Sequence, residues 1–386
     1  MSTTTTDVAI IGGGGAGCAT ALHLAWRKAR CVLLERGFVG GQASGVNYGG
    51  VRQQGRDPAE LPIARRAREI WGRLPELIGT DCEFSVSGHL KLARDHAEEA
   101  ELVAYAETAR EYGIELRVIG RNAIRAEYPW LSDQVVAGSF CADDGQANPR
   151  LLCPALARAA RRAGADIREN ARVSDIARDG DGFVIRTADG NEVRSSILVN
   201  AAGAWGGEIS ARFGEPVPIE TIAPNMAVTE PIPYFIKPNL GVCGGNVYCR
   251  QIPRGNVILG GGRGEADAVA MRARALPEIT LAALRRAVAL VPRLASATII
   301  RTWTGIEGYL PDDIPVVGPS RTTPGLFHAF GFSGHGFAIG PAIGAIMSEL
   351  VLDGRSTTPI GALTIDRFGG CDKVGELPDR ARSRNH

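Results

Sequence analysis

The stretch VAIIGGGGAG occupies residues 8–17, and a second apolar run, CVLL, occupies residues 31–34 and leads directly to Glu35. This order predicts a strand, a Gly-x-Gly-x-x-Gly turn, a helix, a second strand and an acidic residue. These parts together form the fingerprint of a dinucleotide-binding βαβ unit. A chance glycine loop would lack the apolar strand before it and the acid after it, so the sequence indicates an α/β nucleotide-binding domain.

Each glycine of the fingerprint has a physical role. Gly12 permits the tight turn, Gly14 lets the backbone approach a pyrophosphate, and Gly17 lets the helix pack close to the strand. Gly15 and Ala16 open the predicted helix. The free N–H groups and the positive dipole end at this point favour a bound phosphate.

Glu35 sits 18 residues after Gly17, where a carboxylate is expected to accept hydrogen bonds from ribose hydroxyls. An acid at this position favours an unphosphorylated adenosine ribose. The fingerprint alone therefore leaves FAD and NAD open and disfavours NADP.

The composition of the whole chain limits the classes of function. Its 386 residues are enough for two domains, and its net charge of +1 gives no electrostatic case for binding nucleic acid. No apolar stretch approaches the length of a transmembrane helix, and the polar start lacks the layout of a signal peptide, so we expect a cytoplasmic protein. The eight cysteines form no Cys-x-x-Cys and no metal-like cluster, so no metal site is predicted.

The remaining pattern alternates helices and strands. Residues 40–54 are glycine-rich and predict a ligand-facing loop without regular structure. The apolar periodicity predicts helices over 58–78, 95–112, 150–163, 277–292 and 333–352, strands over 88–93, 166–168, 182–187, 192–200, 299–318 and 325–331, and an antiparallel sheet over 216–262.

Five further motifs follow the fingerprint in a fixed order. They are ASGVNYGGVR (43–52), DGQANP (144–149), VNAAGAW (199–205), WTGIEGYLPDDIPVVG (303–318) and GFSGHGF (331–337). Together with the fingerprint, they resemble the D-amino-acid oxidase superfamily of FAD-dependent oxidoreductases. The resemblance covers about 7–352 and is strongest to the branch of glycine oxidase, the β-type subunits of sarcosine oxidase, and opine and hydroxyproline dehydrogenases.

The resemblance implies an α/β fold with two discontinuous domains. A Rossmann-like FAD-binding domain would comprise 1–80, 142–215 and 299–368. A substrate domain of α+β type, built on a mixed, largely antiparallel sheet, would comprise 81–141 and 216–298. The charged tail, 369–386, is expected to be disordered.

The resemblance also implies the residues that bind FAD. They are Gly12, Gly14, Gly15, Ala16, Gly17, Glu35, Arg36, Gly41, Ala43, Ser44, Gly49, Gly50, Val51, Val173, Ala202, Gly203, Trp205, Gly305, Gly331, Ser333, Gly334, His335, Gly336 and Phe337. Because GFSGHGF precedes a predicted helix, its N–H groups and dipole are placed to stabilise negative charge on a reduced flavin. Members of the sarcosine oxidase branch attach the flavin through a cysteine where this chain has Gly305, so non-covalent FAD is expected.

The implied reaction is oxidation of an amino acid or N-substituted amino acid of the sarcosine, proline, D-amino-acid or opine type. Hydride would pass from the α-carbon to flavin N5, and the imine would then hydrolyse. Two familiar carboxylate anchors are absent, because Glu307 replaces an arginine of glycine oxidases and Ala338 replaces a lysine of sarcosine oxidases. These replacements disfavour simple glycine or sarcosine as the substrate.

Five residues are candidates for the substrate site. Arg52 is the first candidate for the substrate carboxylate, and Arg250 is the second, unless Arg250 is a surface strand charge. Glu307 is a candidate for a cationic part of a larger substrate or for the reacting amine, unless it is a solvated loop acid. We expect His335 to contact the flavin through its backbone and ring rather than to abstract a proton. Tyr248 is expected either to hydrogen-bond the substrate or to belong to the core.

The electron acceptor stays open at this point. The oxidase branch uses a lysine over the flavin, and 257–262 contains none, which favours a dehydrogenase that passes electrons to another carrier or partner subunit in an oligomer. The alternatives are an oxidase that releases hydrogen peroxide and a non-catalytic FAD subunit that only relays electrons. An NAD-dependent dehydrogenase would explain the fingerprint but not 199–205 or 331–336.

Overall fold

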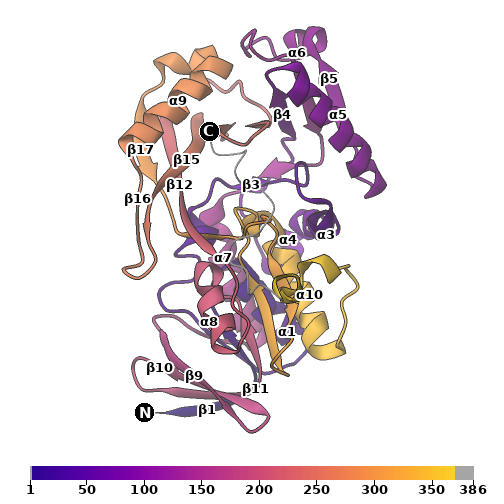
Figure 1. Cartoon of the computed structure of the whole chain (residues 1–386). Helices are drawn as coiled ribbons and strands as arrows, with labels where there is room; N and C mark the ends of the chain where they lie inside the picture. Colours follow the sequence, from indigo (N-terminus) through magenta and orange to yellow (C-terminus); the bar gives the residue numbers. More distant parts are fainter. Residues whose placement is uncertain (1, 370–386) are drawn as a thin grey trace.

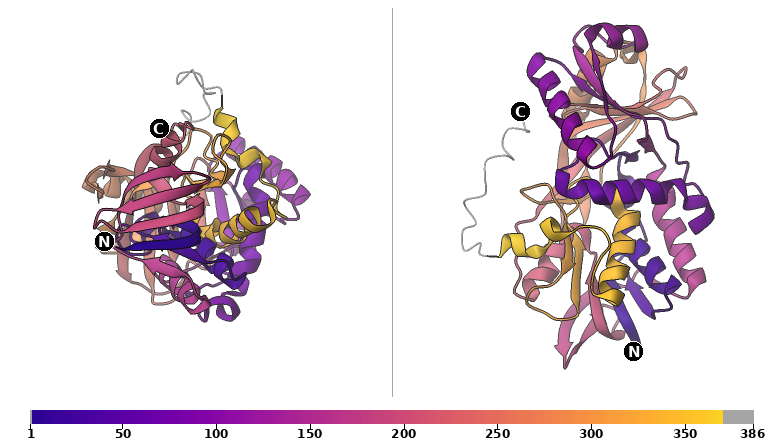
Figure 2. Two further views of the ribbon diagram at one scale, coloured as in Figure 1. Left: turned by 90° about the horizontal axis from the view of Figure 1, so that it is seen from below. Right: turned by 90° about the vertical axis from the view of Figure 1, so that its right-hand side faces the viewer.

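The computed structural model describes residues 2–369, and these form two lobes, each built on its own sheet. Figure 1 shows β1, β11, α1, α8 and α10 in the lower lobe, and β4, β12, β15, α5 and α9 in the upper lobe. The right-hand view in Figure 2 shows the same elongated, two-lobed arrangement. The predicted tail lies outside the described residues except for Gly369.

The sheet of the lower lobe has the strand order β19-β20-β11-β1-β2-β8, and β10 and β9 continue antiparallel from β11. The strands are β1 (Thr3–Ile11), β2 (Cys31–Leu34), β8 (Asp166–Arg168), β9 (Val173–Asp179), β10 (Gly182–Thr187), β11 (Glu192–Asn200), β19 (Val316–Pro319) and β20 (Leu326–Phe330). The four strands β20, β11, β1 and β2 run parallel, and their apolar residues are almost continuously buried, as expected where both faces of a sheet are covered.

This parallel pairing brings the predicted motifs together. Ile11 lies opposite both Leu34 and Asn200, and β20 runs parallel beside β11. The residues that follow these strands are therefore gathered at the carboxyl edge of one sheet. Ligands of open α/β sheets bind at that edge.

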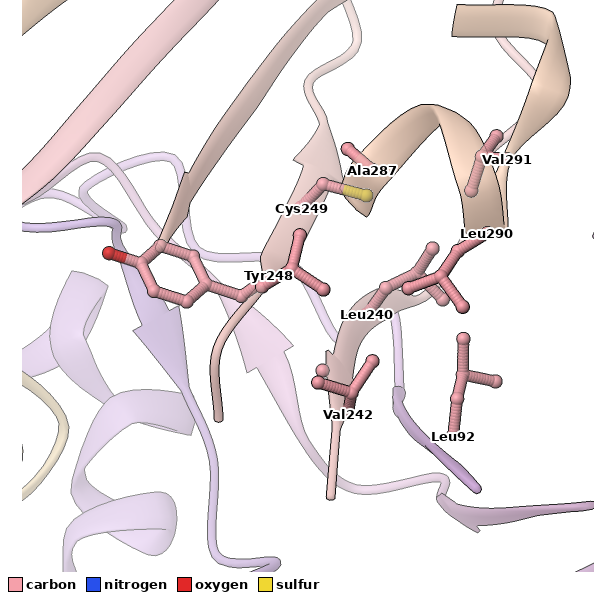
Figure 3. Close-up of a pocket in the computed structure, with 10 residues that line it drawn as sticks. Leu92, Leu240, Val242, Tyr248, Cys249, Ala287, Leu290 and Val291 are labelled. Atoms are coloured by element: carbon pink, nitrogen blue, oxygen red, sulfur yellow. The ribbon is translucent and has the colours of Figure 1, made fainter. Parts of the chain in front are cut away.

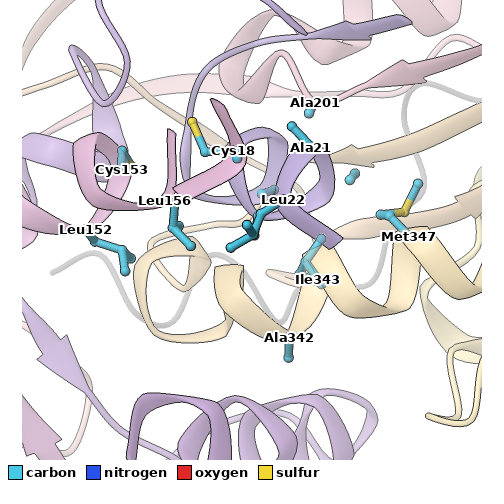
Figure 4. Close-up of a cluster of buried hydrophobic side chains, with 14 of the residues drawn as sticks. Cys18, Ala21, Leu22, Leu152, Cys153, Leu156, Ala201, Ala342, Ile343 and Met347 are labelled. Atoms are coloured by element: carbon cyan, nitrogen blue, oxygen red, sulfur yellow. The ribbon is translucent and has the colours of Figure 1, made fainter. Parts of the chain in front are cut away.

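Helices cover both faces of the lower sheet. They are α1 (Gly15–Trp26), α3 (Leu61–Gly72), α4 (Leu74–Ile78), α7 (Pro149–Ala163), α8 (Gly206–Arg212) and α10 (Gly336–Asp353). Figure 4 shows the core around α1, which packs against both α7 and α10, and Leu22, Leu156 and Ile343 belong to this buried cluster. A Cβ atom on Gly344 would lie 2.4 Å from Ala19, so the small residue allows α10 to pack closely on α1.

Helix α10 corrects one expectation. By length and composition it is the one helix of the described residues that meets the criterion for crossing a membrane, although no apolar stretch of that length was predicted. Most of the helix is buried. Its apolar character on all sides follows from its position between α1 and α3 in the core.

The sheet of the upper lobe has the strand order β17-β12-β15-β14-β13-β4-β6-β5, with β16 paired to β15 and β18 paired to β12. The strands are β4 (His89–Ala93), β5 (Arg117–Gly120), β6 (Ala137–Cys141), β12 (Glu220–Pro231), β13 (Asn239–Val242), β14 (Tyr248–Gln251), β15 (Asn256–Asp267), β16 (Arg272–Arg274), β17 (Ile299–Trp303) and β18 (Glu307–Tyr309). Its helices are α5 (His96–Glu111), α6 (Arg121–Glu127) and α9 (Pro277–Leu290). Only β13 and β4 pair in parallel, so the sheet is mixed and largely antiparallel.

Three other expectations are corrected. The loop over 40–54 contains a helical turn, α2 (Ala43–Val46), and a short strand, β3 (Gly50–Val51), paired with β7 (Gly145–Gln146), because tertiary contacts fix what the glycines leave free. The helix over 58–78 is divided at Arg73, since Pro75 cannot continue the hydrogen-bond ladder. Strand β9 was not predicted, and it forms by pairing with β10.

The predicted boundary at residue 299 also differs from the pairing. Strands β17 and β18 hydrogen-bond to β12 of the upper sheet. That sheet therefore extends to Tyr309, and Glu307 belongs to it rather than to the nucleotide-binding sheet. The registers Met226–Trp303 and Ile222–Glu307 fix this position.

Candidate active site

The fingerprint turn is built as its glycines require. Gly12 has φ +110°, and a Cβ atom there would lie 2.3 Å from the carbonyl oxygen of Ala201. A Cβ atom on Gly17 would lie 1.9 Å from the carbonyl oxygen of Gly12. Only glycine therefore permits this close approach of strand, turn and helix.

Helix α1 begins at this turn without a side-chain cap, and its first N–H group meets a hydroxyl. The Gly15 N–H donates to Ser44 Oγ at 3.0 Å. Helix α10 also begins without a side-chain cap, directly after His335. Two helix N-termini with free N–H groups thus face one space, an arrangement that favours negative charge there.

The space between these helix ends is a cleft with about 590 Å³ of empty volume. Its lining is dominated by small residues, and eleven of its residues were predicted from the sequence. The predicted ones are Gly14, Gly15, Ala16, Ala43, Ser44, Gly203, Glu307, Ser333, Gly334, Gly336 and Phe337. Such a shape admits a ring or a phosphate chain against bare backbone.

Glu35 is held in place at the end of β2. Its Oε2 accepts from the Gly13 N–H at 2.6 Å and its Oε1 accepts from the Gly37 N–H at 2.8 Å. Each carboxylate oxygen keeps a second lone pair for another donor, such as a ribose hydroxyl. The neighbouring Arg36 guanidinium stacks on the Trp205 ring at 3.3 Å. Ala202 and Val173 pack against the buried apolar residues on one face of the lower sheet.

The other predicted cofactor residues shape the loops around the cleft. Gly41, Gly49, Gly50 and Val51 belong to the segment around α2 and β3 and do not line the cleft. The tightest approach is at Gly305, where a Cβ atom would lie 2.0 Å from Val46. Gly331 has φ +70° and turns the chain from β20 toward α10.

Strand β14 supplies Tyr248 and Arg250, whose side chains share one face of the upper sheet because they are two residues apart. Figure 3 shows that the Tyr248 ring points away from the apolar group of Cys249, Leu240 and Leu290 under α9. Tyr248 stacks edge-on against Tyr48, with ring centroids 4.7 Å apart. It therefore faces the α2–β3 segment rather than the core of the upper lobe.

Arg250 is not a surface charge, because only 4% of it is exposed. Its Nε donates to the carbonyl oxygen of Tyr48 at 2.7 Å, and its Nη1 donates to Gln146 Oε1 at 2.8 Å. Within the described residues, Nη2 has no hydrogen bond and no carboxylate lies within ion-pair distance. Burial accordingly lowers the pKa of Arg250, although Tyr48 and Glu83 oppose that effect.

Glu307, on β18, is not a solvated loop acid. It is 9% exposed, lines the cleft, and its Oε2 has no hydrogen-bond partner among the described residues. Burial raises the pKa of Glu307 to about 7, and the Tyr309 hydroxyl beside it acts in the opposite direction. Burial also raises the pKa of Tyr248, and the nearby charge of Glu307 adds to this rise.

His335 is oriented by a residue that the sequence did not indicate. Its Nδ1 lies 2.9 Å from Glu60 Oε2, and Glu60 is fully buried. Burial and Arg56 together lower the pKa of His335 to about 4, so the neutral ring donates its Nδ1 proton to the carboxylate. Burial would raise the pKa of Glu60, but His335 and Arg56 outweigh it.

Arg52 lies near this pair but is not within the cleft lining. Its Nη1 donates to the carbonyl oxygen of Gln54. Its charge lowers the pKa values of His335 and Glu60, and the buried Arg56 next to it leaves Nε and Nη1 without partners. Arg52, Tyr248, Arg250 and His335 are thus not among the residues that line the cleft.

Several residues of this site were not predicted from the sequence. Asn47 and Tyr48 stand inside a quoted motif, so their positions were available as signals. Gln146 also stands inside a quoted motif, whereas Glu60 gave no such signal, because it acts through His335, 275 positions away. Within the described residues, no cluster of three or more potential metal ligands occurs.

Comparison with known proteins places this site in a family. The family model for FAD dependent oxidoreductases (DAO) matches residues 7–350. Because the match spans nearly the whole chain, the protein belongs to this family. It is an FAD-dependent oxidoreductase, as the motifs indicated.

Individual relatives match the chain over most of its length. The chain is 28% identical to glycine oxidase of Geobacillus kaustophilus, over 96% of this chain and 98% of that protein. It is 25% identical to sarcosine oxidase subunit beta of Rhizobium meliloti, over 94% and 88%. The crystal structure of L-proline dehydrogenase from P. horikoshii superposes with a TM-score of 0.87 at 28% identity, over 95% and 98%. Several other relatives are longer, and the chain spans less than half of their length.

The residues present fit FAD. Gly14, Gly15 and Ala16 line the cleft almost without side chains, and the Glu35 carboxylate lies beside them at Gly13. Two uncapped helix ends face the cleft, which suits the negative charge of a pyrophosphate and of a reduced flavin.

Proposed function

We propose that this enzyme oxidises the C–N bond of an amino acid or N-substituted amino acid. The observation that carries the proposal is the pair of buried, unpaired charges on the upper sheet, the guanidinium of Arg250 and the carboxylate of Glu307. An amino acid brings one group of each sign. The relatives named for glycine, sarcosine and proline act on such molecules.

Arg250 binds the substrate carboxylate in this proposal. It is fixed by two hydrogen bonds and keeps Nη2 for a ligand. Burial without a counter-ion is costly, and a carboxylate offsets that cost. Arg52, the first candidate from the sequence, donates a hydrogen bond from Nη1 to the Gln54 carbonyl oxygen. In this proposal it contributes positive potential from nearby.

The other residues of the site act on the bound cofactor rather than on the substrate. When bound, FAD supplies the acceptor for the hydride of the substrate α-carbon. The N-terminus of α10 stabilises negative charge in the cleft, and Glu60 fixes the neutral ring of His335. At neutral pH His335 is not a general acid, because its pKa of about 4 keeps the ring neutral, and with its Nδ1 proton donated to Glu60 it offers only a weakly basic Nε2.

We further propose that the FAD is held without a covalent bond and that the electrons pass to a carrier or partner subunit. No cysteine lines the cleft among the described residues. A relative is named as the β-subunit of a sarcosine oxidase, which supports a partner subunit. Direct reduction of oxygen is the alternative, because another relative is named an oxidase.

The test is the visible spectrum of the purified protein during anaerobic titration with D-amino acids, L-proline, D-hydroxyproline, sarcosine and octopine. Bleaching of the flavin band by one of these compounds supports the proposal. A flavin band that none of them bleaches contradicts it and favours an electron-relay subunit. Admitting air then separates the two acceptors, since rapid return of the band indicates an oxidase.

A further inference from the structure

Glu307 is the one charged side chain among the residues that line the cleft in the described part of the chain. It stands on β18, which is anchored by pairing Ile222 with Glu307. Its Oε2 is buried and has no hydrogen-bond donor. A buried carboxylate oxygen without a donor is destabilising, so the site is incomplete without a ligand group.

The surroundings of Oε2 show which side it faces. A Cβ atom on Gly334 would lie 3.6 Å from Oε2 and 2.7 Å from the Tyr309 hydroxyl. Oε2 therefore lies beside the Ser333–Gly334 turn that precedes α10, inside the cleft. Within the described residues, no lysine, arginine or histidine forms an ion pair with Glu307, so a cationic group of a ligand would meet no competing positive partner at Oε2.

The chemistry of the substrate class identifies that cation. Every amino-acid substrate carries an ammonium group at the nitrogen that reacts, whereas only some carry a second cation. The carboxylate of the substrate has a separate partner in the buried Arg250. Arg250 lies on the face of β14 that also carries Tyr248. Tyr248 in turn lies close enough to Glu307 to sense its charge.

We propose that Glu307 binds the reacting ammonium group of the substrate and so selects amines over neutral donors. This inference rests on the proposed function, because it assigns the amine of that reaction to a residue. Glu307 acts here as a positioning and specificity residue. With Arg250 it fixes both ends of a zwitterion, which sets the position of the α-carbon between them.

The experiment uses two ligands of one shape and different charge. Betaine carries a quaternary ammonium group and, lacking a nitrogen lone pair, cannot be oxidised to an imine, and 3,3-dimethylbutanoate has a neutral carbon in the same place. Their dissociation constants for the FAD-loaded protein are measured from the shift of the visible flavin spectrum. We expect wild type to bind betaine about tenfold more tightly, and Glu307→Gln to bind the two equally.

The matched control is Glu220→Gln, on the neighbouring strand β12, whose carboxylate pairs with Arg263 in solvent. It should keep the tenfold preference. The inference is overturned if wild type binds both ligands equally or binds neither, a result that needs no variant. It is also overturned if Glu307→Gln keeps the preference.

The binding experiment distinguishes a failure of the cation site from a failure of the proposed function. Binding requires no turnover, so a charge preference without bleaching by any amine would contradict the function and leave the cation site. Bleaching without a charge preference would contradict the cation site alone. A change of kcat with unchanged KM in Glu307→Gln would also contradict a role in amine binding.

Discussion

The two sides of the cleft are built from different materials. The side formed by the lower sheet is backbone, with glycines at 12, 14, 15, 17, 334 and 336 and with polar groups that already have partners. The side formed by the upper sheet carries buried charges: Glu307 lines the cleft with its Oε2 unpartnered, and the buried Arg250, outside that lining, has no ion-pair partner among the described residues. We call these the glycine side and the charged side. The comparison indicates that the glycine side is already shaped to hold the cofactor, whereas the charged side has charged groups that a substrate would pair.

The largest effect is expected on the glycine side. Gly17→Ala places a Cβ atom 1.9 Å from the Gly12 carbonyl oxygen, so strand and helix must separate. We expect a loss of about 4 kcal/mol or more in the free energy of unfolding and loss of bound FAD. Thermal unfolding and the flavin absorbance of the purified protein measure both. Gly120→Ala is the control, since no atom lies within 4 Å of that Cβ position, and full FAD content in Gly17→Ala would refute the close-packing argument.

On the charged side, Glu307 should make the free energy of unfolding of the FAD-free protein depend on pH. The pKa of Glu307 in the folded state is about 7, above its ordinary value of 4.5, so folding favours its protonated form. The associated stability is fully present below pH 4.5 and is lost as the pH rises through 7, by an amount on the order of 3 kcal/mol. Urea unfolding of wild type and Glu307→Gln from pH 5 to 8.5 measures the difference. Parallel pH curves for the two proteins would mean that Glu307 is not buried as a carboxylate.

Arg250→Gln tests the same side through the substrate. Removing the guanidinium leaves the substrate carboxylate without a counter-ion, and we expect KM to rise about 100-fold, equivalent to about 2.7 kcal/mol. FAD content should not change, because Arg250 does not line the cleft. The matched control is Arg254→Gln, four residues along, which pairs with Glu83 in solvent. Unchanged KM in Arg250→Gln would move the carboxylate site to Arg52.

The smallest effect concerns Trp205, a large side chain on the glycine side. Trp205 stacks under Arg36, and its Nε1 donates to the carbonyl oxygen of Ala268 in the β15–β16 hairpin at 3.0 Å. Trp205→Phe removes this hydrogen bond, and we expect FAD affinity to fall about fivefold, or about 1 kcal/mol. Fluorescence titration of the FAD-free protein measures the affinity, with Trp26→Phe at an exposed site as the control. A fall of 100-fold would show that Trp205 carries far more than this single bond.

The two sides also differ in how far the sequence predicts them. The glycine side could be predicted because each motif follows a strand, and parallel pairing brings the strand ends together. The position of Glu307 depends on β18 joining the upper sheet, which no local pattern indicates. Glu60 was missed because its role depends on a contact with His335 across 275 positions. Conversely, Arg52 was ranked above Arg250 from a resemblance, and only the fold reveals that Arg250 is buried and oriented by Tyr48 and Gln146, whereas Arg52 donates one hydrogen bond to the Gln54 carbonyl oxygen.

The crystal structure of the FAD-loaded protein with bound betaine tests this division of labour most directly. We predict FAD along the glycines, with the betaine carboxylate on Arg250 and its ammonium group beside Glu307. A betaine whose carboxylate lies against Ser333 and Gly334, with Glu307 and Arg250 unliganded, would contradict the assignment of the charged side to the substrate.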